Sequence, residues 1–211
     1  PCTVEKIGYK KGKVKEPLLV CGKDKALKCG EEFKVFNYGF YRKTEKEIKI
    51  GYLYPRNSYD LMKAVVNGIY TFAKLGKYHG EKDLYTMAGL LDLDVKAMVR
   101  EEYELGDITD YKRAANKLQK IEGIDLVIAL VPDGMEEDGP YNPFKTIWAK
   151  ANIPSQMISM KTAKLFAEEA KEGNKAKNSS RYYLHNIILG ILGKTGGIPW
   201  VVKDMPGNVD C

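Results

Sequence analysis

The nearly continuous apolar run Ile124–Val131 (IDLVIALV) constrains the fold of this chain more than any other feature. A strand with one face in water alternates apolar and polar residues, whereas a strand covered by helices on both faces does not. The run is also far shorter than the roughly 20 apolar residues that cross a bilayer. It therefore predicts a central strand, buried on both sides, within a parallel sheet.

Strand-like and helix-like segments alternate around this run. The expected strands are 48–54, 95–104, 153–160 and 198–202. The expected helices are one from Asn57 or Ser58 to Gly76, one from Asp107 or Thr109 to Gly123, one with Pro143 in its first turn, and the segments 161–172 and 181–192. This alternation predicts an α/β fold over residues 46–211: a Rossmann-like three-layer domain with a mostly parallel sheet and helices on both faces.

Residues 1–45 differ from the rest of the chain. They are rich in Lys and Gly and show no sustained periodicity. We interpret them as a linker segment that precedes the domain, either solvated or folded into a short hairpin. The alternative is a basic arm that follows a polyanion.

Composition and charge exclude several classes of protein. The chain has 34 Lys and Arg against 28 Asp and Glu, a formal charge of +6, and a hydrophobic share of 44 %, which is typical of a globular protein. No signal peptide or membrane span is recognisable, so we expect a cytoplasmic protein with no membrane partner. The cysteines form no CxxC pair and are expected to be reduced: Cys2, Cys21, Cys29 and Cys211. The chain starts at Pro1 without a Met, and we expect it to be a piece of a longer protein.

The common nucleotide-binding and catalytic motifs are missing. No GxGxxG follows an expected strand. The segment Gly190–Gly197 (GILGKTGG) has the ending of a phosphate-binding P-loop, but the opening glycine of that motif falls on Ile188 and the segment follows a helix. With only two histidines, no Ser/His/Asp or Cys/His set stands out. The sequence therefore gives no support to an ordinary hydrolase or dehydrogenase.

A candidate anion site is suggested by the segment 141–156 (YNPFKTIWAKANIPSQ). Tyr141 and Lys145 lie over the first turn of an expected helix, where free backbone N–H groups and the helix dipole favour an anion. Gln156 adds an amide near the start of the next strand, and Lys194 follows the last apolar helix. Because ligands of open α/β sheets bind at the carboxyl ends of the strands, we expect the site there. Each residue also has an ordinary alternative: a surface pair, a bond to a loop, or a cation at a helix end.

The order of Tyr-x3-Lys, IPSQ, an apolar helix and GKTGGIPW resembles the MID domain of Argonaute proteins, particularly the archaeal and bacterial ones. The resemblance covers about residues 46–211, and residues 27–41 resemble the linker that leads into that domain. It implies binding of the 5′-phosphorylated end of a single-stranded guide RNA or DNA, with the PIWI domain of the same parent chain as a partner. The nuclease carboxylates of PIWI are absent here, so the resemblance implies that this segment is not itself catalytic and that any guide-directed cleavage belongs to the parent protein.

The resemblance also assigns roles to the residues that hold the phosphate. Tyr141 would stack on the first base and touch the terminal phosphate. Lys145 and Gln156 would hold that phosphate, helped by the backbone N–H of Met157. Lys194 would face the same pocket, and Asn186 would lie near a following phosphate.

Two further features follow from the resemblance. The loop 133–140 would border the first base, and its Glu136, Glu137 and Asp138 could influence which base is accepted. Four residues before Lys194, where relatives carry a second lysine or a residue that assists a divalent cation, this chain has Gly190. We therefore expect either less positive charge in the site or a cation such as Mg²⁺ that is shared with the guide phosphates.

Two alternatives stay open at this point. One is a Rossmann-like enzyme domain that acts on a small phosphorylated metabolite or nucleotide, with Asp133 as its acid or base. The other is a scaffold domain whose pocket is a vestige. The motifs do not distinguish an RNA from a DNA guide, a 5′-phosphate from a 5′-hydroxyl, or one first base from another.

Overall fold

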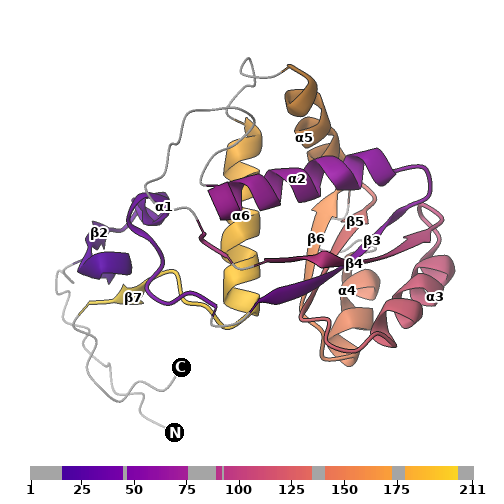
Figure 1. The fold of residues 1–211 in the computed structure, drawn as a ribbon, viewed down its shortest axis with the longest axis horizontal. Coiled ribbons are helices and arrows are strands. Elements are labelled where there is room, and N and C mark those ends of the chain that lie inside the picture. Colours follow the sequence, from indigo (N-terminus) through magenta and orange to yellow (C-terminus); the bar gives the residue numbers. More distant parts are fainter. Residues whose placement is uncertain are drawn as a thin grey trace, which may run out of the picture.

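The structure is a computed structural model that describes residues 16–44, 47–75, 89–91, 93–134, 141–172 and 179–203. Within these ranges the backbone alone is described at 73–75, 94–98, 141, 142, 172 and 179. Figure 1 shows a larger α/β part and a smaller part, with one long helix between them. Over the described ranges, no helix is both long and apolar enough to cross a membrane.

The larger part is built on a four-stranded sheet in the order β4-β3-β5-β6, in which every neighbouring pair is parallel. The strands are β3 (Ile48–Pro55), β4 (Leu93–Tyr103), β5 (Leu126–Val131) and β6 (Ser155–Ser159). All six residues of β5 are buried, because β5 lies inside the sheet and helices cover both of its faces. The predicted central strand and parallel sheet are confirmed.

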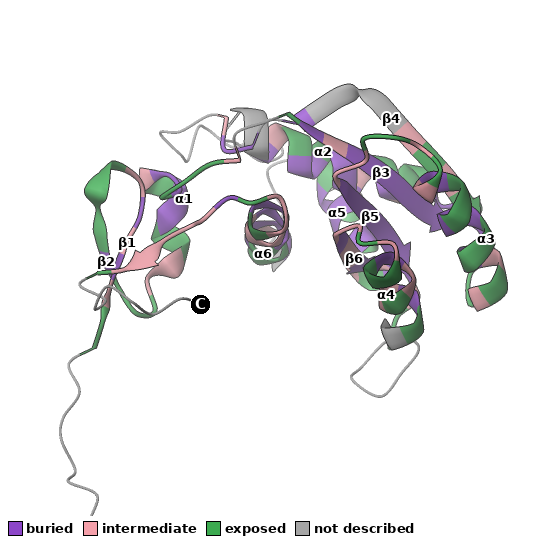
Figure 2. Cartoon of the chain, turned by 90° about the horizontal axis from the view of Figure 1, so that it is seen from below, coloured by how far each residue is buried: buried purple, intermediate pink, exposed green. Residues whose placement is uncertain are grey.

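Helices cover both faces of this sheet, as Figure 2 shows by the buried strands between them. One face, with Ile50, Ile128 and Leu130, shares a hydrophobic core with α2 (Tyr59–Leu75), α5 (Met160–Glu172) and α6 (Ser179–Lys194). The other face, with Leu53 and Val127, packs against α3 (Ile108–Gln119) and α4 (Tyr141–Lys150). Neighbouring residues of one strand therefore belong to different cores, which is why β5 is apolar without alternation. The predicted three-layer α/β fold is confirmed.

Local signals set the ends of α3 as the sequence predicts. Asp107 is the N-cap, and its Oδ1 accepts hydrogen bonds from the backbone N–H groups of Thr109 at 2.8 Å and Asp110 at 3.1 Å. Such a cap satisfies donors that a helix start otherwise leaves without a partner, and it is worth about 1 kcal/mol. Beyond the helix end, Gly123 has a φ of +78°, which a side chain would strain.

Buried aromatic side chains join α3, α4 and the sheet. Trp148 donates from Nε1 to the hydroxyl oxygen of Tyr111 at 2.7 Å, and Tyr103 donates from its hydroxyl to the carbonyl of Leu130 at 2.7 Å. Tyr111 also meets the ring of Phe144 edge-on, with 4.3 Å between centroids. Because each buried polar atom has a partner, these large rings add apolar contact without the cost of an unsatisfied donor. The first part of α4 is thereby fixed against the sheet.

The smaller part is an antiparallel sheet in the order β2-β1-β7, formed by β1 (Leu18–Val20), β2 (Ala26–Lys28) and β7 (Val201–Val202). Two short 3-10 turns, η1 (Gly22–Asp24) and η2 (Glu32–Lys34), and the short helix α1 (Val35–Tyr38) complete it. The predicted hairpin in the N-terminal segment is present as β1 and β2. The predicted strand 198–202 is shorter and does not join the parallel sheet, because the chain after α6 pairs with the N-terminal segment, first through the bridge between Arg42 and Ile198.

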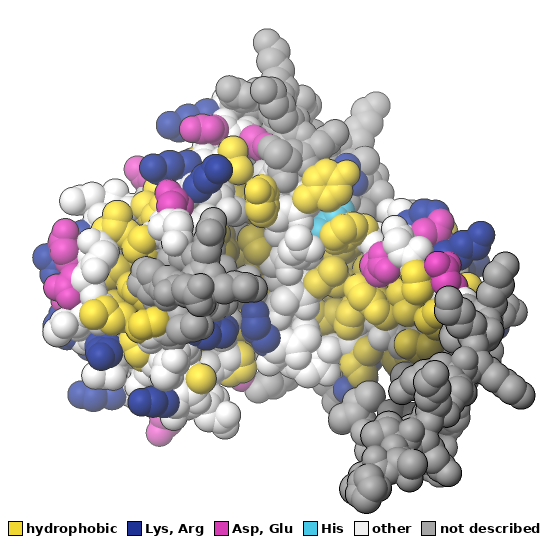
Figure 3. All heavy atoms as spheres, turned by 180° about the vertical axis from the view of Figure 1, so that it is seen from behind, with side chains coloured by type: hydrophobic (Ala, Val, Ile, Leu, Met, Phe, Trp, Pro, Cys, Tyr) yellow, Lys and Arg dark blue, Asp and Glu magenta, His cyan; other side chains and the backbone are white. Residues whose placement is uncertain are grey.

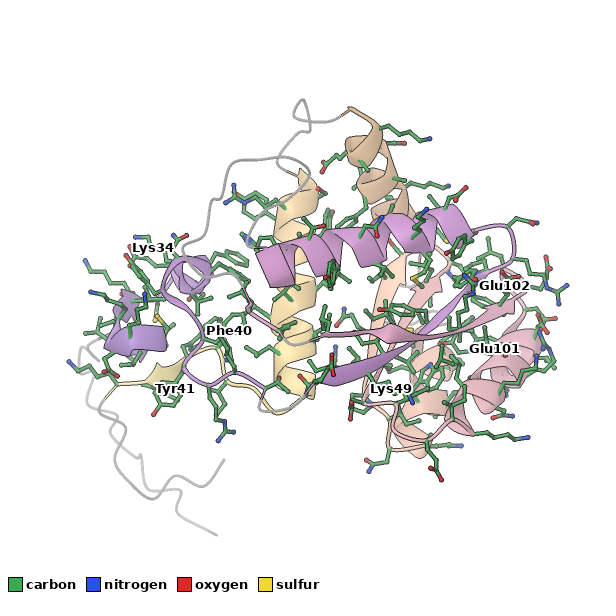
Figure 4. All side chains as sticks on the ribbon, viewed as in Figure 1. Lys34, Phe40, Tyr41, Lys49, Glu101 and Glu102 are labelled. Atoms are coloured by element: carbon green, nitrogen blue, oxygen red, sulfur yellow. The ribbon has the colours of Figure 1, made fainter. Side chains whose placement is uncertain are left out.

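The N-terminal segment is packed, not only solvated. Val35, Phe36 and Phe40 are buried in the same core as α2 and α6. The Phe36 ring stacks on His185 of α6 at 4.3 Å between centroids and meets Phe72 of α2 edge-on at 5.4 Å. Figure 4 marks Phe40 on the stretch that runs from α1 toward β3. The described part of the predicted linker therefore shares a hydrophobic core with the α/β domain.

Candidate anion-binding site

Lys194 and Gln156 meet where the end of α6 lies against β6. Lys194 is the last residue of α6, and Gln156 is the second residue of β6. The ammonium Nζ of Lys194 donates to the amide Oε1 of Gln156 at 2.5 Å, and both residues are half-buried. The ammonium group of the last residue of α6 and the side-chain amide of an edge strand are therefore held together.

A second ammonium group reaches the same strand from α4. Nζ of Lys145 donates to the backbone carbonyl of Ser155 at 2.5 Å and to its hydroxyl at 2.9 Å. Ser155 is buried and directly precedes Gln156, so Lys145 and Lys194 approach neighbouring residues of β6. The structure thus brings together three of the residues that the sequence predicts for the site. The sequence reasoning missed Ser155, although it stands beside Gln156 in the IPSQ motif.

The two lysines are electrostatically strained. Burial lowers the pKa of Lys145, and burial together with the positive charge of Lys145 lowers the pKa of Lys194 to about 8. Within the described ranges, neither lysine forms an ion pair with a carboxylate. Two like charges in a half-buried place without a counter-charge favour the binding of an anion, because an anion restores both pKa values.

Gly190 makes room for this arrangement. A β-carbon at this position would lie 2.7 Å from Oε1 of Gln156 and 3.5 Å from Nζ of Lys194. The first distance is shorter than a carbon and an oxygen tolerate without displacement. The absence of a side chain at position 190 therefore lets the Gln156 amide approach Lys194.

The site does not lie where the sequence analysis expects it. Ser155 and Gln156 are the first two residues of β6, so the lysines gather at the amino end of an edge strand and not at the carboxyl ends of the sheet. The general rule depends on loops and helix starts that follow strands. Here the cations come instead from within α4 and from the last residue of α6, whose long side chains reach β6.

The structure describes only some of the other predicted site residues. Met157 follows Gln156 in β6 and is paired with Ala129 of β5. Asn186 is exposed on α6, two turns before Lys194. Tyr141 begins α4, but its side chain is outside the description, and Glu136, Glu137 and Asp138 lie outside the described residues altogether.

Asp133 forms a hydrogen bond that stabilises the start of α5. Its Oδ1 accepts a hydrogen bond at 2.6 Å from the backbone N–H of Lys161, in the first turn of α5. A carboxylate at a helix start satisfies a backbone donor and complements the helix dipole. The residue named for the enzyme alternative is thus occupied in joining the end of β5 to α5.

The carboxyl ends of β3 and β4 carry a different polar hollow, of about 350 Å³. Three of its four cations have carboxylate partners, among them Lys117, which pairs with Glu101 at 3.2 Å, and Arg113, which pairs with Asp110 at 2.5 Å. Figure 4 marks Glu101 and Glu102 there, beside α3. The hollow is lined by Tyr54, Arg56, Arg100, Glu101, Glu102, Arg113 and Lys117. Because most of its positive charges are paired with carboxylates, this hollow attracts an anion less than the Lys145–Lys194 pair does.

The lysine site does not fit a divalent cation held by the protein alone. Its side chains supply two ammonium groups and an amide oxygen that already accepts a hydrogen bond. Magnesium prefers carboxylate, carbonyl and water oxygens. Across the part of the chain that the structure describes, no group of three or more His, Cys, Asp or Glu side chains is placed to hold a metal.

The N-terminal segment supports the end of α6 through contacts that the sequence did not predict. The Thr44 hydroxyl shares a hydrogen bond at 2.9 Å with the hydroxyl of Thr195, which directly follows Lys194. Arg42 donates to the carbonyl of Gly196 at 3.3 Å, and its backbone pairs with Ile198. These contacts fix the turn that follows Lys194.

Comparison with known proteins agrees with this fold. No protein-family model matches the chain. The solved structure of Clostridium butyricum Argonaute, bound to a guide DNA with a 5′ deoxycytidine and a 19-mer target DNA, is 42 % identical with a TM-score of 0.79, and the match covers 97 % of this chain and 26 % of that one. The curated Argonaute of Aquifex aeolicus is 31 % identical over 99 residues, which are 44 % of this chain and 12 % of that protein.

A more distant structure shares the fold. The Argonaute of Methanocaldococcus jannaschii has a TM-score of 0.57 at 15 % identity, over 90 % of this chain and 27 % of that one. The structure defines the class of protein as an α/β domain in which two lysines meet at an edge strand, without a carboxylate partner among the described residues. The chain belongs to the Argonaute family, as a segment with the size and fold of the MID domain. It spans about a quarter of the Clostridium protein.

Proposed function

We propose that this segment binds the 5′-phosphorylated end of a single-stranded guide nucleic acid. Lys145, Gln156 and Lys194 hold the terminal phosphate, with the backbone N–H of Met157 as a further donor. Tyr141 stacks on the first base, and Asn186 contacts a following phosphate. The observation that carries the proposal is the pair of half-buried lysines with lowered pKa values and no described carboxylate partner.

A terminal phosphate suits this pair because it carries about −1.5 to −2 charges at neutral pH. Three or four charge-assisted hydrogen bonds, at about 1.5–3 kcal/mol each, give a gross gain of roughly 5–12 kcal/mol. Association costs at least about 4 kcal/mol. The isolated segment is therefore expected to bind a phosphorylated end with micromolar to millimolar affinity.

The relatives support a guide strand as the ligand but not a single end chemistry. The Clostridium Argonaute is bound to a guide DNA, and the Argonaute of Marinitoga piezophila, at 16 % identity and a TM-score of 0.50 over 90 % of this chain and 27 % of that one, is in complex with a 5′ OH guide RNA. We infer a 5′-phosphate for this chain because Lys145 and Lys194 provide two positive groups at one place. A 5′-hydroxyl would leave their repulsion in place.

The rest of the parent protein completes the proposal. The PIWI domain of the same chain would lie beside this segment and would carry any nuclease activity. A magnesium ion, where one takes part, would be held chiefly by the guide phosphates, since the described side chains of the site are positive or neutral. Binding is therefore to be measured both with and without magnesium.

The experiment is a titration of short single strands that differ only in a 5′-phosphate or a 5′-hydroxyl, at fixed salt. The native chain is expected to prefer the phosphate, and Lys145→Ala is expected to lose that preference. Lys150→Ala is the matched control, because it removes one exposed cation from the same helix. Equal binding of both ends by the native chain, or an unchanged preference in Lys145→Ala, would contradict the proposal.

A further inference from the structure

The exposed face of α6 continues away from the phosphate site. At about 100° per residue, one side of this helix holds Lys194, Gly190 and Asn186, and further toward the start of the helix it holds two tyrosines. Tyr182 is 60 % exposed and Tyr183 is 45 % exposed. The opposite side is buried in the core through Leu184, Ile187, Ile188, Ile191 and Leu192. The helix therefore presents one continuous surface that begins at the candidate phosphate site and ends at aromatic rings.

The Tyr182 ring forms a small platform with a residue of the N-terminal segment. Phe33 is 38 % exposed and meets the Tyr182 ring edge-on, with 6.2 Å between centroids. On its other side Phe33 contacts His185 at 5.2 Å, so it is held against α6 by the core below. We call Phe33 and Tyr182 the aromatic platform. Figure 3 shows hydrophobic side chains gathered beside the histidine on this face of the molecule.

Few side chains protrude from the surface of α6 between the aromatic platform and the phosphate site. Gly193 has no side chain, and a β-carbon at this position would meet nothing within 4 Å, whereas Gly190 faces Gln156 of β6. Asn186 is the exposed polar residue on this stretch of the helix. A polymer anchored at Lys194 can therefore follow the helix closely, and the distance from Lys194 to Tyr182 is about 18 Å along the axis.

We propose that the aromatic platform stacks on a base of the bound single strand about five nucleotides from its anchored end. This inference rests on the proposed 5′-phosphate function. At about 3.4 Å per stacked nucleotide, five steps cover the length from Lys194 to Tyr182. Every base has a π-face, so such stacking contributes affinity without sequence preference. With the platform, the affinity of the segment depends on the length of the bound strand as well as on its 5′ end.

The test compares 5′-phosphorylated strands of about three and about eight nucleotides, because only the longer strand reaches the platform. The native chain is expected to bind the longer strand about tenfold more tightly at fixed salt. Tyr182→Ala is expected to lose this gain, and Tyr182→Phe is expected to keep it because the ring remains. Tyr70→Ala is the matched control, since Tyr70 is an exposed tyrosine of α2 outside the platform.

A fluorescent 2-aminopurine base placed near the fifth or sixth nucleotide gives a direct readout. Stacking on Tyr182 is expected to quench it in the native chain and in Tyr182→Phe, and not in Tyr182→Ala. An equal gain with length in Tyr182→Ala overturns this inference and leaves another protein surface as the occupant of the platform. A loss of the 5′-phosphate preference for the short strand would instead overturn the proposed function, and the two failures are thus distinguishable.

Discussion

A β-carbon on Gly190 would lie 2.7 Å from Oε1 of Gln156, the oxygen that accepts the hydrogen bond of Lys194. A side chain at position 190 and the present position of the Gln156 amide therefore exclude each other. From the sequence, the glycine is expected to leave the site either with less positive charge or dependent on a shared cation. The geometry makes it a requirement for the contact between strand and helix.

Gly190→Ala is accordingly expected to weaken binding of a 5′-phosphorylated strand by about tenfold, the equivalent of one charge-assisted hydrogen bond. The free energy of unfolding is expected to change by less than about 1 kcal/mol, because alanine favours the helix and a flexible amide can move aside. Titration and denaturant unfolding measure the two effects. Gly193→Ala is the matched control on the same helix, since its β-carbon meets nothing within 4 Å. Equal affinities of the two variants would show that the Gln156 amide does not contribute to binding.

The lowered pKa of Lys194, about 8, predicts how binding depends on pH. Above pH 8 Lys194 of the free protein becomes neutral, so phosphate binding must take up a proton and the affinity falls by up to about tenfold per pH unit. Below about pH 6 the terminal phosphate itself loses charge. Affinity for a 5′-phosphate is therefore expected to be greatest between about pH 6 and pH 8.

Lys194→Arg separates this explanation from others, because the guanidinium stays charged throughout the range. The decline of affinity above pH 8 should disappear in this variant, even if its affinity at pH 7 is lower. A decline of the same size in Lys194→Arg would assign the titration to another group, such as Lys145, whose pKa is also lowered.

Asp133→Asn distinguishes the enzyme alternative from guide binding. The carboxylate of Asp133 bonds to the N–H of Lys161 at the start of α5, and its replacement by an amide removes the charge at that helix end. We expect a loss of about 0.5–1 kcal/mol in the free energy of unfolding, with the 5′-phosphate preference unchanged. Turnover of a nucleotide or sugar phosphate by the native chain that disappears in Asp133→Asn would contradict this.

Much of the fold could be predicted from local signals. The unalternating apolar residues of β5, the cap at Asp107 and the glycine after α3 each act through neighbouring residues of the chain. That Lys145, Gln156 and Lys194 come close together could also be predicted, from the order of their motifs. These features depend on the spacing of residues along the chain, which can be read from the sequence.

The position of the site and the second sheet could not be predicted, since they depend on distant contacts. Lys145 reaches the amino end of β6 only because of how α4 crosses the sheet. The strand β7 joins β1 because the turn after α6 meets Arg42, 156 residues earlier than Ile198. Phe36 is buried against His185, a residue equally distant from it in the sequence. The short Lys-rich segment around Phe36 has no periodicity from which this burial could be inferred.

Lys194→Met is expected to stabilise the fold while it removes phosphate binding. In the native chain the pKa of Lys194 is lowered from 10.5 to about 8, chiefly by burial and then by Lys145, so its charged form is disfavoured in the folded state. The unfolded chain therefore binds more protons than the folded one between about pH 8 and pH 10.5, and the stability of the native chain rises with pH across this interval.

Lys194→Met should lack this rise in stability. Its free energy of unfolding should be greater than that of the native chain by roughly 1 kcal/mol at pH 7, a value reduced from the full pKa shift because solvent screens a half-buried group. Denaturant unfolding at pH 7 and pH 10 measures both effects, with Lys150→Met as the control for loss of an exposed cation. A destabilised Lys194→Met at pH 7 would mean that the bond to Gln156 outweighs the repulsion from Lys145, and the strained lysine pair would then lose its role as the source of anion affinity.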